Sequence, residues 1–407
     1  MQTFYPDTYS TLSISMVAFA GFYYFREKNK TIDTLKGSYR EFRLKSYDKN
    51  WNKSEMFFFN ILIALAASIL FIPYLGAVPL FDWDEANFAE SAREMITSGN
   101  YFTVQINYQT FWEKPPLFMW LQSAAMHMFG INEFSARFPN AIAGVATLLV
   151  LFNLGRKEFD IKFGLLWVLA YAGSILPHFY FKSGIIDPVF NLFIFLGLYN
   201  FARLTAKPLK EPGRKGLATW AGIFTGLAVL TKGPVAFLII SLCTIVYFAV
   251  KRSIKIITFQ ELVLFCGSVA LLSIAWFGVG VIKEGTFFMV EFIEYQIRLF
   301  STEDAGHGGP FFYHFLVLLL GCFPASIYVI KAFMRQYSDN NRQRNLKAWM
   351  IISLLVVLIL FSIVRTKIVH YSSFCYFQSP FWPPIHFTKS TGIELIFQDG
   401  FMFGSWP

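Results

Sequence analysis

The first secure membrane span is predicted at Met56 to Leu80, which reads MFFFNILIALAASILFIPYLGAVPL. A helix of this length crosses a hydrocarbon core about 30 Å thick, because each residue adds 1.5 Å. Apolar stretches recur along the whole chain, in which 55% of the residues are hydrophobic and 15% are charged. With a mean hydropathy of +0.47, this composition excludes an ordinary soluble domain and indicates a polytopic membrane protein.

Further apolar stretches predict more spans, so the expected fold is an all-α polytopic membrane protein of about ten transmembrane helices. These stretches lie at residues 134–155, 163–181, 188–204, 217–231, 233–250, 260–282, 313–334, 348–364 and 371–388. Two other apolar runs are short for a span. Residues 9–25 either cross the membrane or only anchor the chain. Residues 117–130 are expected to form a helix at the membrane surface, with Gln122, Ser123 and His127 as a solvated stripe.

The basic residues indicate the orientation. The formal net charge of +9 comes from short Lys and Arg clusters between apolar runs, which indicates membrane topology and not a nucleic-acid surface. With the spans above, 25 of the 35 Lys and Arg residues fall on one side, nine fall on the other, and Lys389 lies in the tail. Such an imbalance marks the basic side as cytoplasmic. The polar stretch after the first span therefore faces the exterior.

Three regions are expected along the chain. Residues 1–55 form an N-terminal extension with a basic cytoplasmic segment, residues 56–377 form the membrane-embedded domain, and residues 378–407 form a divergent or truncated tail. The four cysteines all lie in apolar stretches and have no metal-ligand spacing. Neither a disulfide framework nor a zinc site is predicted from them.

The polar stretch from Asp82 to Pro116 concentrates carboxylates between aromatic residues. Charges near hydrocarbon are costly unless they are paired or used. The spacing of apolar and polar residues predicts that residues 84–98 form an amphipathic helix on the membrane surface. One face of it carries Phe88, Ala92 and Met95, another carries Glu90, Glu94 and Thr97, and its first positions are Asp84 and Glu85.

Three carboxylates are candidates for acid–base chemistry: Asp84, Glu85 and Asp187. Asp84 is the preferred general base, because an exposed carboxylate at a helix start can reach an acceptor hydroxyl that approaches from outside the membrane. Aspartate is also a favoured N-cap, so both roles stay open. Glu85 has an alternative role, because an acidic residue in the first turn of a helix is favoured by the helix dipole. Asp187 precedes Pro188, so its alternative role is to cap the start of the next span.

Cations on the same side of the membrane are candidates for binding an anionic substrate. Lys114 lies between Glu113 and two prolines, where it either binds phosphate as a point charge or forms a surface ion pair worth about 0–1 kcal/mol. Lys232 divides two apolar runs, and snorkelling to the interface is its other explanation. The remaining candidates lie at a span end or in the large exterior loop, namely Arg298, His307, Arg365 and Lys367.

An ordered set of motifs in this sequence resembles a known family. The set comprises Asp84-Glu85, Ala89-Glu90, Ala92-Arg93-Glu94-Met95, Phe111-Trp112-Glu113-Lys114-Pro115-Pro116-Leu117, Trp120, Ala136-Arg137-Phe138-Pro139, Asp187-Pro188, Leu230-Thr231-Lys232-Gly233-Pro234, Gly309-Pro310-Phe311 and Arg365 to Lys367. It is similar to that of bacterial membrane glycosyltransferases, whose members include the lipid A aminoarabinose transferases and the protein O-mannosyltransferases. The resemblance covers residues 56–377.

The resemblance implies a C-type glycosyltransferase fold in the bacterial cytoplasmic (inner) membrane, with the active site on the periplasmic or exterior face. It implies a polyprenyl-phosphate sugar as donor, a lipid A-like glycolipid or a protein as acceptor, and membrane lipids as partners. Asp84 matches the family's catalytic aspartate, Asp187 matches its second important aspartate, and Lys114 matches a contact to the donor phosphate.

The resemblance also raises the question of a bound metal ion. Some aminoarabinose transferases bind zinc through a glutamate that matches Glu113 and a histidine in the large exterior loop. Here Gln296 or its neighbour Tyr295 stands in the place of that histidine. We therefore predict no metal ligands, and dependence on a divalent metal stays open.

The leading interpretation is an inverting glycosyltransferase in which Asp84 deprotonates the acceptor and the cations stabilise the departing phosphate. One alternative is a transporter or lipid-binding protein without chemistry. Transporters place ionisable groups near the middle of the membrane, whereas the charges here fall at span ends, which favours the transferase. The other alternative is an inactive truncated pseudoenzyme, because family members continue through further spans beyond Gln378.

Overall fold

The computed structural model describes residues 53–81, 83–111, 113–252, 256–301, 308–333 and 340–382. The expected short span at 9–25, most of the basic N-terminal segment, Asp82, His307 and the tail from 383 onward lie outside the described residues. The chain divides into two compact units, residues 1–62 and 63–407. Of the first unit only 53–62, the beginning of helix α3, is described. All helices from α4 onward belong to the second unit.

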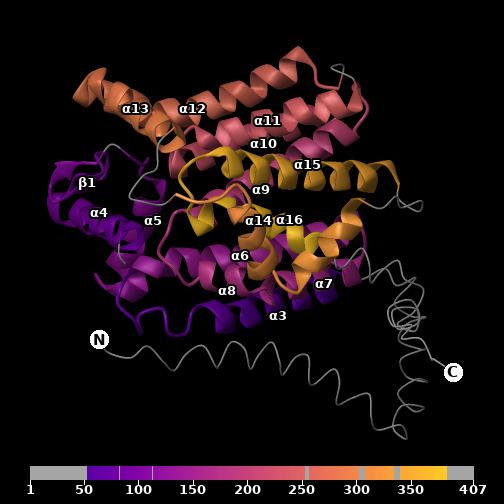
Figure 1. Ribbon diagram of the computed structural model, residues 1–407, viewed down its shortest axis with the longest axis horizontal. Helices are drawn as coiled ribbons and strands as arrows, with labels where there is room; N and C mark the ends of the chain where they lie inside the picture. Colours follow the sequence, from indigo (N-terminus) through magenta and orange to yellow (C-terminus); the bar gives the residue numbers. More distant parts are fainter. Residues whose placement is uncertain are drawn as a thin grey trace, which may run out of the picture. The chain divides into compact units, whose positions relative to one another are not determined.

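Most of the described structure is helical (Figure 1). They are α3 (Lys53–Phe71), α4 (Asp84–Ser98), α5 (Leu117–Phe129), α6 (Glu133–Glu158), α7 (Ile161–Ala172), α8 (Ile175–Tyr180), α9 (Asp187–Ala206), α10 (Arg214–Lys232), α11 (Val235–Lys251), α12 (Phe259–Glu284), α13 (Phe287–Ser301), α14 (Tyr313–Gly321), α15 (Asn341–Ile363) and α16 (Cys375–Gln378). The 3₁₀ helices are η1 (Ala325–Phe333), η2 (Val369–Ser372) and η3 (Ser379–Phe381). The all-α architecture expected from the sequence is confirmed.

Five described helices are long and apolar enough to cross a membrane: α3, α6, α9, α12 and α15. Two shorter apolar helices, α7 and α11, accompany them. The protein is therefore an integral membrane protein. The expected number of about ten spans stays a prediction, because several of the apolar stretches form helices below the length of a secure span.

Three of the expected spans are broken. Residues 163–181 divide into α7 and α8 at Gly173 and Ser174. Residues 313–334 divide into α14 and η1 around Pro324, which has no backbone N–H to continue the hydrogen-bond ladder. The described part of 371–388 consists of the short helices η2, α16 and η3. Hydrophobicity alone could not show these breaks, because a broken and a continuous helix bury similar apolar side chains.

Helices α9, α10, α11, α12 and α15 pack side by side (Figure 1). Small residues allow helices to approach closely, as α10 and α12 do. A Cβ atom at Gly222 would lie 2.5 Å from the Phe265 carbonyl oxygen, so only glycine fits there. Association of helices within a membrane depends on this kind of contact, because lipid is as apolar as the helix surface.

The expected helix at 84–98 is confirmed as α4, and its expected apolar residues Phe88, Ala92 and Met95 are buried. Its expected polar face is only partly right. Glu94 is buried, because a two-stranded hairpin, β1 (Gln105–Ile106) and β2 (Gln109–Thr110), folds back onto the helix. The Tyr108 amide in the hairpin turn donates a hydrogen bond to Glu94, 2.9 Å long.

The expected interfacial helix at 117–130 is confirmed as a short helix, α5. The solvated stripe expected on it is wrong for two residues of three. Gln122 and Ser123 are buried, and they donate to the carbonyl oxygens of Ala136 and Ala92. These two side chains fix α5 against its neighbours, because a buried polar group needs a hydrogen-bond partner.

Candidate active site

Asp84 is the first residue of α4. Its carboxylate faces His370, with 3.4 Å between Asp84 Oδ2 and His370 Nε2, and the Asp84 side chain is 32% exposed. The N-cap position belongs to Trp83, whose backbone has φ 67° and whose side chain makes no capping hydrogen bond. The capping role that the sequence left open for Asp84 therefore has no support in the geometry, whereas a role in a charged cluster does.

Asp187 is the first residue of α9, and Pro188 follows it in the first turn as the sequence predicts. Its side chain is only 3% exposed. One carboxylate oxygen forms an ion pair with Lys232, the last residue of α10. The other oxygen lies 3.8 Å from His370 Nε2. The start of α9 and the end of α10 thus place a paired carboxylate beside the imidazole that Asp84 faces.

Lys114 belongs to the same cluster. Its side chain is 11% exposed and its ammonium lies 3.8 Å from Glu113. The ammonium donates a 3.0 Å hydrogen bond to the hydroxyl of Tyr295 on α13. Burial lowers the pKa of Lys114, while the carboxylates of Glu113, Asp84 and Asp187 act in the opposite direction. A mostly buried lysine with a long contact to its neighbouring glutamate is unlike the exposed ion pair that the sequence left open.

His370 is the functional candidate that the sequence reasoning missed. It lies on η2, and its side chain is 17% exposed. Burial lowers its pKa, Asp187 and Asp84 raise it, and Lys232 and Lys114 lower it. The next residue, Tyr371, has its ring 5.1 Å from the Lys232 ammonium. The only signal in the sequence was position, because His370 and Tyr371 closely follow the Arg365 to Lys367 segment.

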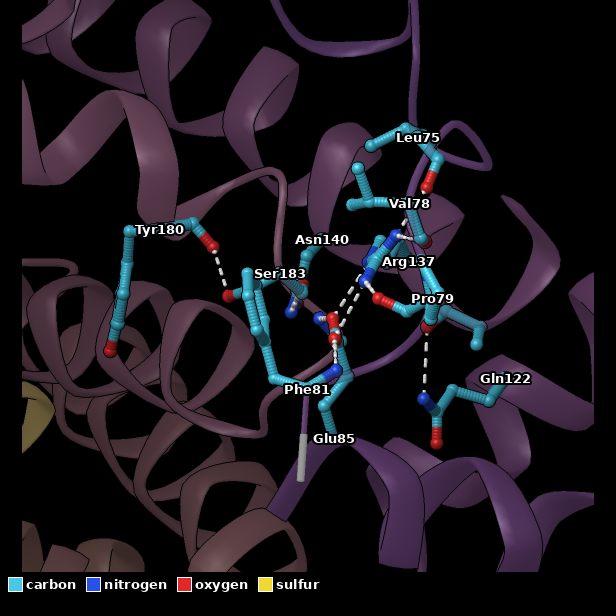
Figure 2. Close-up of polar contacts among 12 residues, drawn as sticks. Leu75, Val78, Pro79, Phe81, Glu85, Gln122, Arg137, Asn140, Tyr180 and Ser183 are labelled. Atoms are coloured by element: carbon cyan, nitrogen blue, oxygen red, sulfur yellow. Dashed lines mark hydrogen bonds and ion pairs between the residues drawn. The ribbon is translucent and has the colours of Figure 1, made fainter. Parts of the chain in front are cut away.

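Glu85 does not share this cluster. It forms a buried ion pair with Arg137, 2.7 Å long (Figure 2). Its carboxylate also accepts the backbone N–H groups of Phe81 and Gly184. Arg137 donates in addition to the carbonyl oxygens of Leu75, Val78 and Pro79. This geometry favours a structural role for Glu85 over the expected role of a base, because both of its oxygens accept hydrogen bonds from buried donors.

The other expected cations lie away from the cluster or in different roles. Lys367 donates to the carbonyl oxygens of Phe361, Ser362 and Val364 at the end of α15, so its charge satisfies a helix terminus. Arg365 is exposed. Arg298 is also exposed, and its guanidinium lies 5.2 Å from the ring centre of Tyr295. His307 lies outside the described residues, so the expectation for it stays a prediction.

The residues that the resemblance places at a zinc site do not fit a metal. Glu113 lies beside the Lys114 ammonium, and the Tyr295 hydroxyl is hydrogen-bonded to the same ammonium. A cation in that place would meet a positive charge. Across the described residues, no three His, Cys, Asp or Glu side chains form a group that could hold a metal ion. We assign no chemical step to a metal.

Comparisons with known proteins show which proteins this chain resembles in sequence and fold. The family described as dolichyl-phosphate-mannose-protein mannosyltransferase matches residues 113–280. The crystal structure of ArnT from Cupriavidus metallidurans bound to undecaprenyl phosphate has the same fold, with a TM-score of 0.71 and 21% identity over 81% of this chain and 60% of that one. The chain resembles the lipid-linked-sugar membrane glycosyltransferases in sequence and fold. The resemblance drawn from its motifs is confirmed.

Curated relatives extend the comparison. The chain is 25% identical over 323 residues to the undecaprenyl phosphate-alpha-4-amino-4-deoxy-L-arabinose arabinosyl transferase of an Enterobacter species, a match that covers 78% of this chain. It is 28% identical over 321 residues to an uncharacterized protein of Aquifex aeolicus, of which it covers 70%. The chain spans only 57% of the length of the arabinosyl transferase.

Proposed function

We propose that this protein transfers a sugar from a polyprenyl-phosphate donor to a hydroxyl or phosphate of an acceptor. The observation that carries the proposal is the cluster of Asp84, Lys114, Asp187, Lys232 and His370 at helix ends. It combines a partly exposed carboxylate with two lysines, which are the groups that proton abstraction and phosphate binding need. The relatives whose names include undecaprenyl phosphate support this choice of donor.

In the proposed reaction Asp84 takes the proton of the acceptor hydroxyl. The acceptor oxygen attacks the anomeric carbon from the face opposite the lipid phosphate, so the configuration inverts. The bond between that carbon and the phosphate oxygen breaks, and the polyprenyl phosphate leaves with the bonding electron pair. Lys114 and Lys232 stabilise the charge that develops on the phosphate, and this stabilisation counts most where water is largely excluded.

Asp187 has a supporting part in this proposal. It already forms an ion pair with Lys232 and lies largely buried, so it is a poor base for an acceptor that arrives from solvent. We assign it the task of holding the Lys232 ammonium in place for the phosphate. An ionic partner at hydrogen-bond distance fixes a long, flexible side chain that otherwise loses entropy on binding.

We further propose that the acceptor is a lipid A-like glycolipid or a protein, and that the site faces the periplasm or exterior of a bacterial cytoplasmic membrane. The arabinosyl transferase relatives support the glycolipid, and the mannosyltransferase family supports the protein. The proposed orientation rests on the excess of Lys and Arg on the opposite side of the membrane.

The test uses the purified full chain in detergent and a panel of polyprenyl-phosphate sugars, with a lipid A acceptor in one series and a peptide acceptor in another. We expect one donor to be consumed, with release of polyprenyl phosphate that depends on the acceptor. Binding of the lipid phosphate without consumption of any donor would contradict the proposal and favour a lipid-binding protein without chemistry.

A further inference from the structure

The environment of His370 Nε2 fixes where its proton must be. This nitrogen lies 3.4 Å from Asp84 Oδ2 and 3.8 Å from Asp187 Oδ2. A bare ring nitrogen would direct its lone pair at two carboxylates, which is repulsive, whereas an N–H there is attracted to both. The Asp187 oxygen is buried and has no hydrogen-bond partner among the described groups. The carboxylates therefore select the Nε2–H form.

We propose that His370 is a positioning residue for Asp84. Its Nε2–H faces one oxygen of the Asp84 carboxylate and orients the carboxylate, which leaves the other oxygen for the acceptor hydroxyl. This inference deepens the function proposed above and rests on it for its catalytic consequence. The tautomer and the contact, however, can be measured without any substrate.

The surrounding charges favour a neutral imidazole. The groups that face it are Asp84 at the start of α4, Asp187 on α9, Lys232 at the end of α10, and Lys114 in the loop before α5. Two carboxylates and two ammonium groups nearly cancel, and burial then disfavours the charged ring. A neutral histidine carries one ring proton, so Nε2–H leaves Nδ1 as the acceptor nitrogen.

A buried polar network fixes the segment that carries His370. The Ser372 hydroxyl lies 3.1 Å from Nδ1 of His314 on α14. The amide of Asn191 donates to the hydroxyls of Ser373 and Tyr180, at 2.8 and 2.9 Å. Asn191 lies one helical turn beyond Asp187 on α9. The helix that carries Asp187 is thus tied to the segment that carries His370.

The proposal predicts a loss of turnover without a loss of donor binding. His370→Ala should lower kcat by about 10- to 100-fold, the range for loss of a hydrogen bond to a charged group. The donor KM should change little, because the lysines bind the phosphate.

The first test is nitrogen NMR of histidine-labelled full chain in lipid bilayers. The chain has only six histidines, so the His370 signals are those lost in His370→Gln. We expect a protonated Nε2 and a bare Nδ1 at neutral pH, and a shifted Nε2 signal in Asp84→Asn. A bare Nε2, or a signal that Asp84→Asn leaves unchanged, would overturn the inference whether or not the protein turns over a sugar donor.

The second test measures kcat and the donor KM of sugar transfer. His370→Gln, whose amide can still donate, should retain a higher kcat than His370→Ala, and the matched control His127→Gln should keep the wild-type kcat and KM. His127 lies on α5, where its ring contacts Tyr101. An equal loss of kcat in both His370 variants, or a donor KM that rises as much as kcat falls, would show a purely structural role and overturn the inference. No transfer by the wild type would instead contradict the proposed function, and the NMR experiment would still decide the tautomer.

Discussion

At the scale of single residues, the site is a compact arrangement of opposite charges. Lys232 pairs with Asp187, His370 lies between Asp187 and Asp84, and Lys114 completes the cluster. Charges of one sign would repel each other in a partly dehydrated place. Here carboxylates and ammonium groups alternate, and the cluster still offers the Lys114 and Lys232 ammonium groups to an arriving phosphate.

The lowered pKa of Lys114 predicts how binding of the lipid phosphate depends on pH. Its ammonium is lost at a lower pH than that of an ordinary lysine, so affinity for polyprenyl phosphate should decline as pH rises through that lowered value. Lys114→Arg should abolish this alkaline decline, because guanidinium stays charged. Lys114→Ala should bind weakly at every pH. Titration of tryptophan fluorescence with polyprenyl phosphate measures the affinities, and unchanged affinity in Lys114→Ala would leave the lysine without a binding role.

The residue-scale site was only partly predictable from sequence. Asp84, Lys114, Asp187 and Lys232 could be selected, because each is a charge placed against apolar surroundings. The ion pair of Glu85 with Arg137 could not be predicted, since neighbours on a helix point about 100° apart and Asp84 turns toward His370 instead. His370 could not be found, because proximity to residues far away in the sequence has no signature along one chain.

At the scale of the helices, one buried ion pair organises the entry to α4. Glu85 and Arg137 join α4 to α6, and their other hydrogen bonds fix the segment from Leu75 to Phe81. Asp84 is the neighbour of Glu85, so the direction of the Asp84 carboxylate depends on this anchor. A structural residue that lies next to a functional one can therefore imitate a catalytic phenotype.

Removal of the Glu85 carboxylate should show how much the ion pair with Arg137 stabilises the protein. We expect Glu85→Ala to destabilise the protein by about 3–5 kcal/mol, because it leaves the Arg137 charge buried and unpaired. Glu90→Ala, which removes the partly exposed pair with Arg93 on the same helix, should cost no more than about 1 kcal/mol. Equilibrium unfolding in mixed micelles measures both. Equal stability of the two variants would contradict the anchoring role.

The close contact of α10 and α12 makes a separate prediction. Gly222→Ala should destabilise by about 1–3 kcal/mol, because its Cβ atom would overlap the Phe265 carbonyl oxygen. The matched control on the same helix is Gly216→Ala, whose Cβ atom would meet nothing within 4 Å. There alanine should stabilise by about 0.5–1 kcal/mol through its helix propensity. The midpoints of thermal unfolding of the two variants in detergent should shift in opposite directions from that of the wild type. Similar shifts in both variants would contradict the close packing.

At the scale of the whole molecule, orientation connects the site to its substrates. The all-α membrane character was predictable, because hydrocarbon requires long apolar segments whatever their detailed packing. The helix breaks within the expected spans at 163–181 and 313–334 were not, because they depend on local turns and on neighbouring helices. The orientation stays a prediction, drawn from the Lys and Arg imbalance.

Thiol labelling tests the orientation. With the exposed Cys266 first replaced by alanine, single cysteines at Gln109 in β2 and at Glu211 before α10 should react from opposite sides of the membrane. An impermeant reagent added to intact cells should label Gln109→Cys only, and Glu211→Cys should react after permeabilisation. Labelling of both positions in intact cells would contradict the prediction that the site faces the exterior.

The assignment of Asp84 as the general base is tested most directly by the rate of sugar transfer. Wild type and Asp84→Asn are compared as full chains at matched protein levels. Asparagine keeps the size and the contact with His370 Nε2 but cannot take a proton from the acceptor. We predict turnover about 10²- to 10⁴-fold lower, the usual contribution of a positioned general base, with polyprenyl-phosphate binding unchanged. Turnover by Asp84→Asn at the wild-type rate would contradict the assignment of Asp84 as the base.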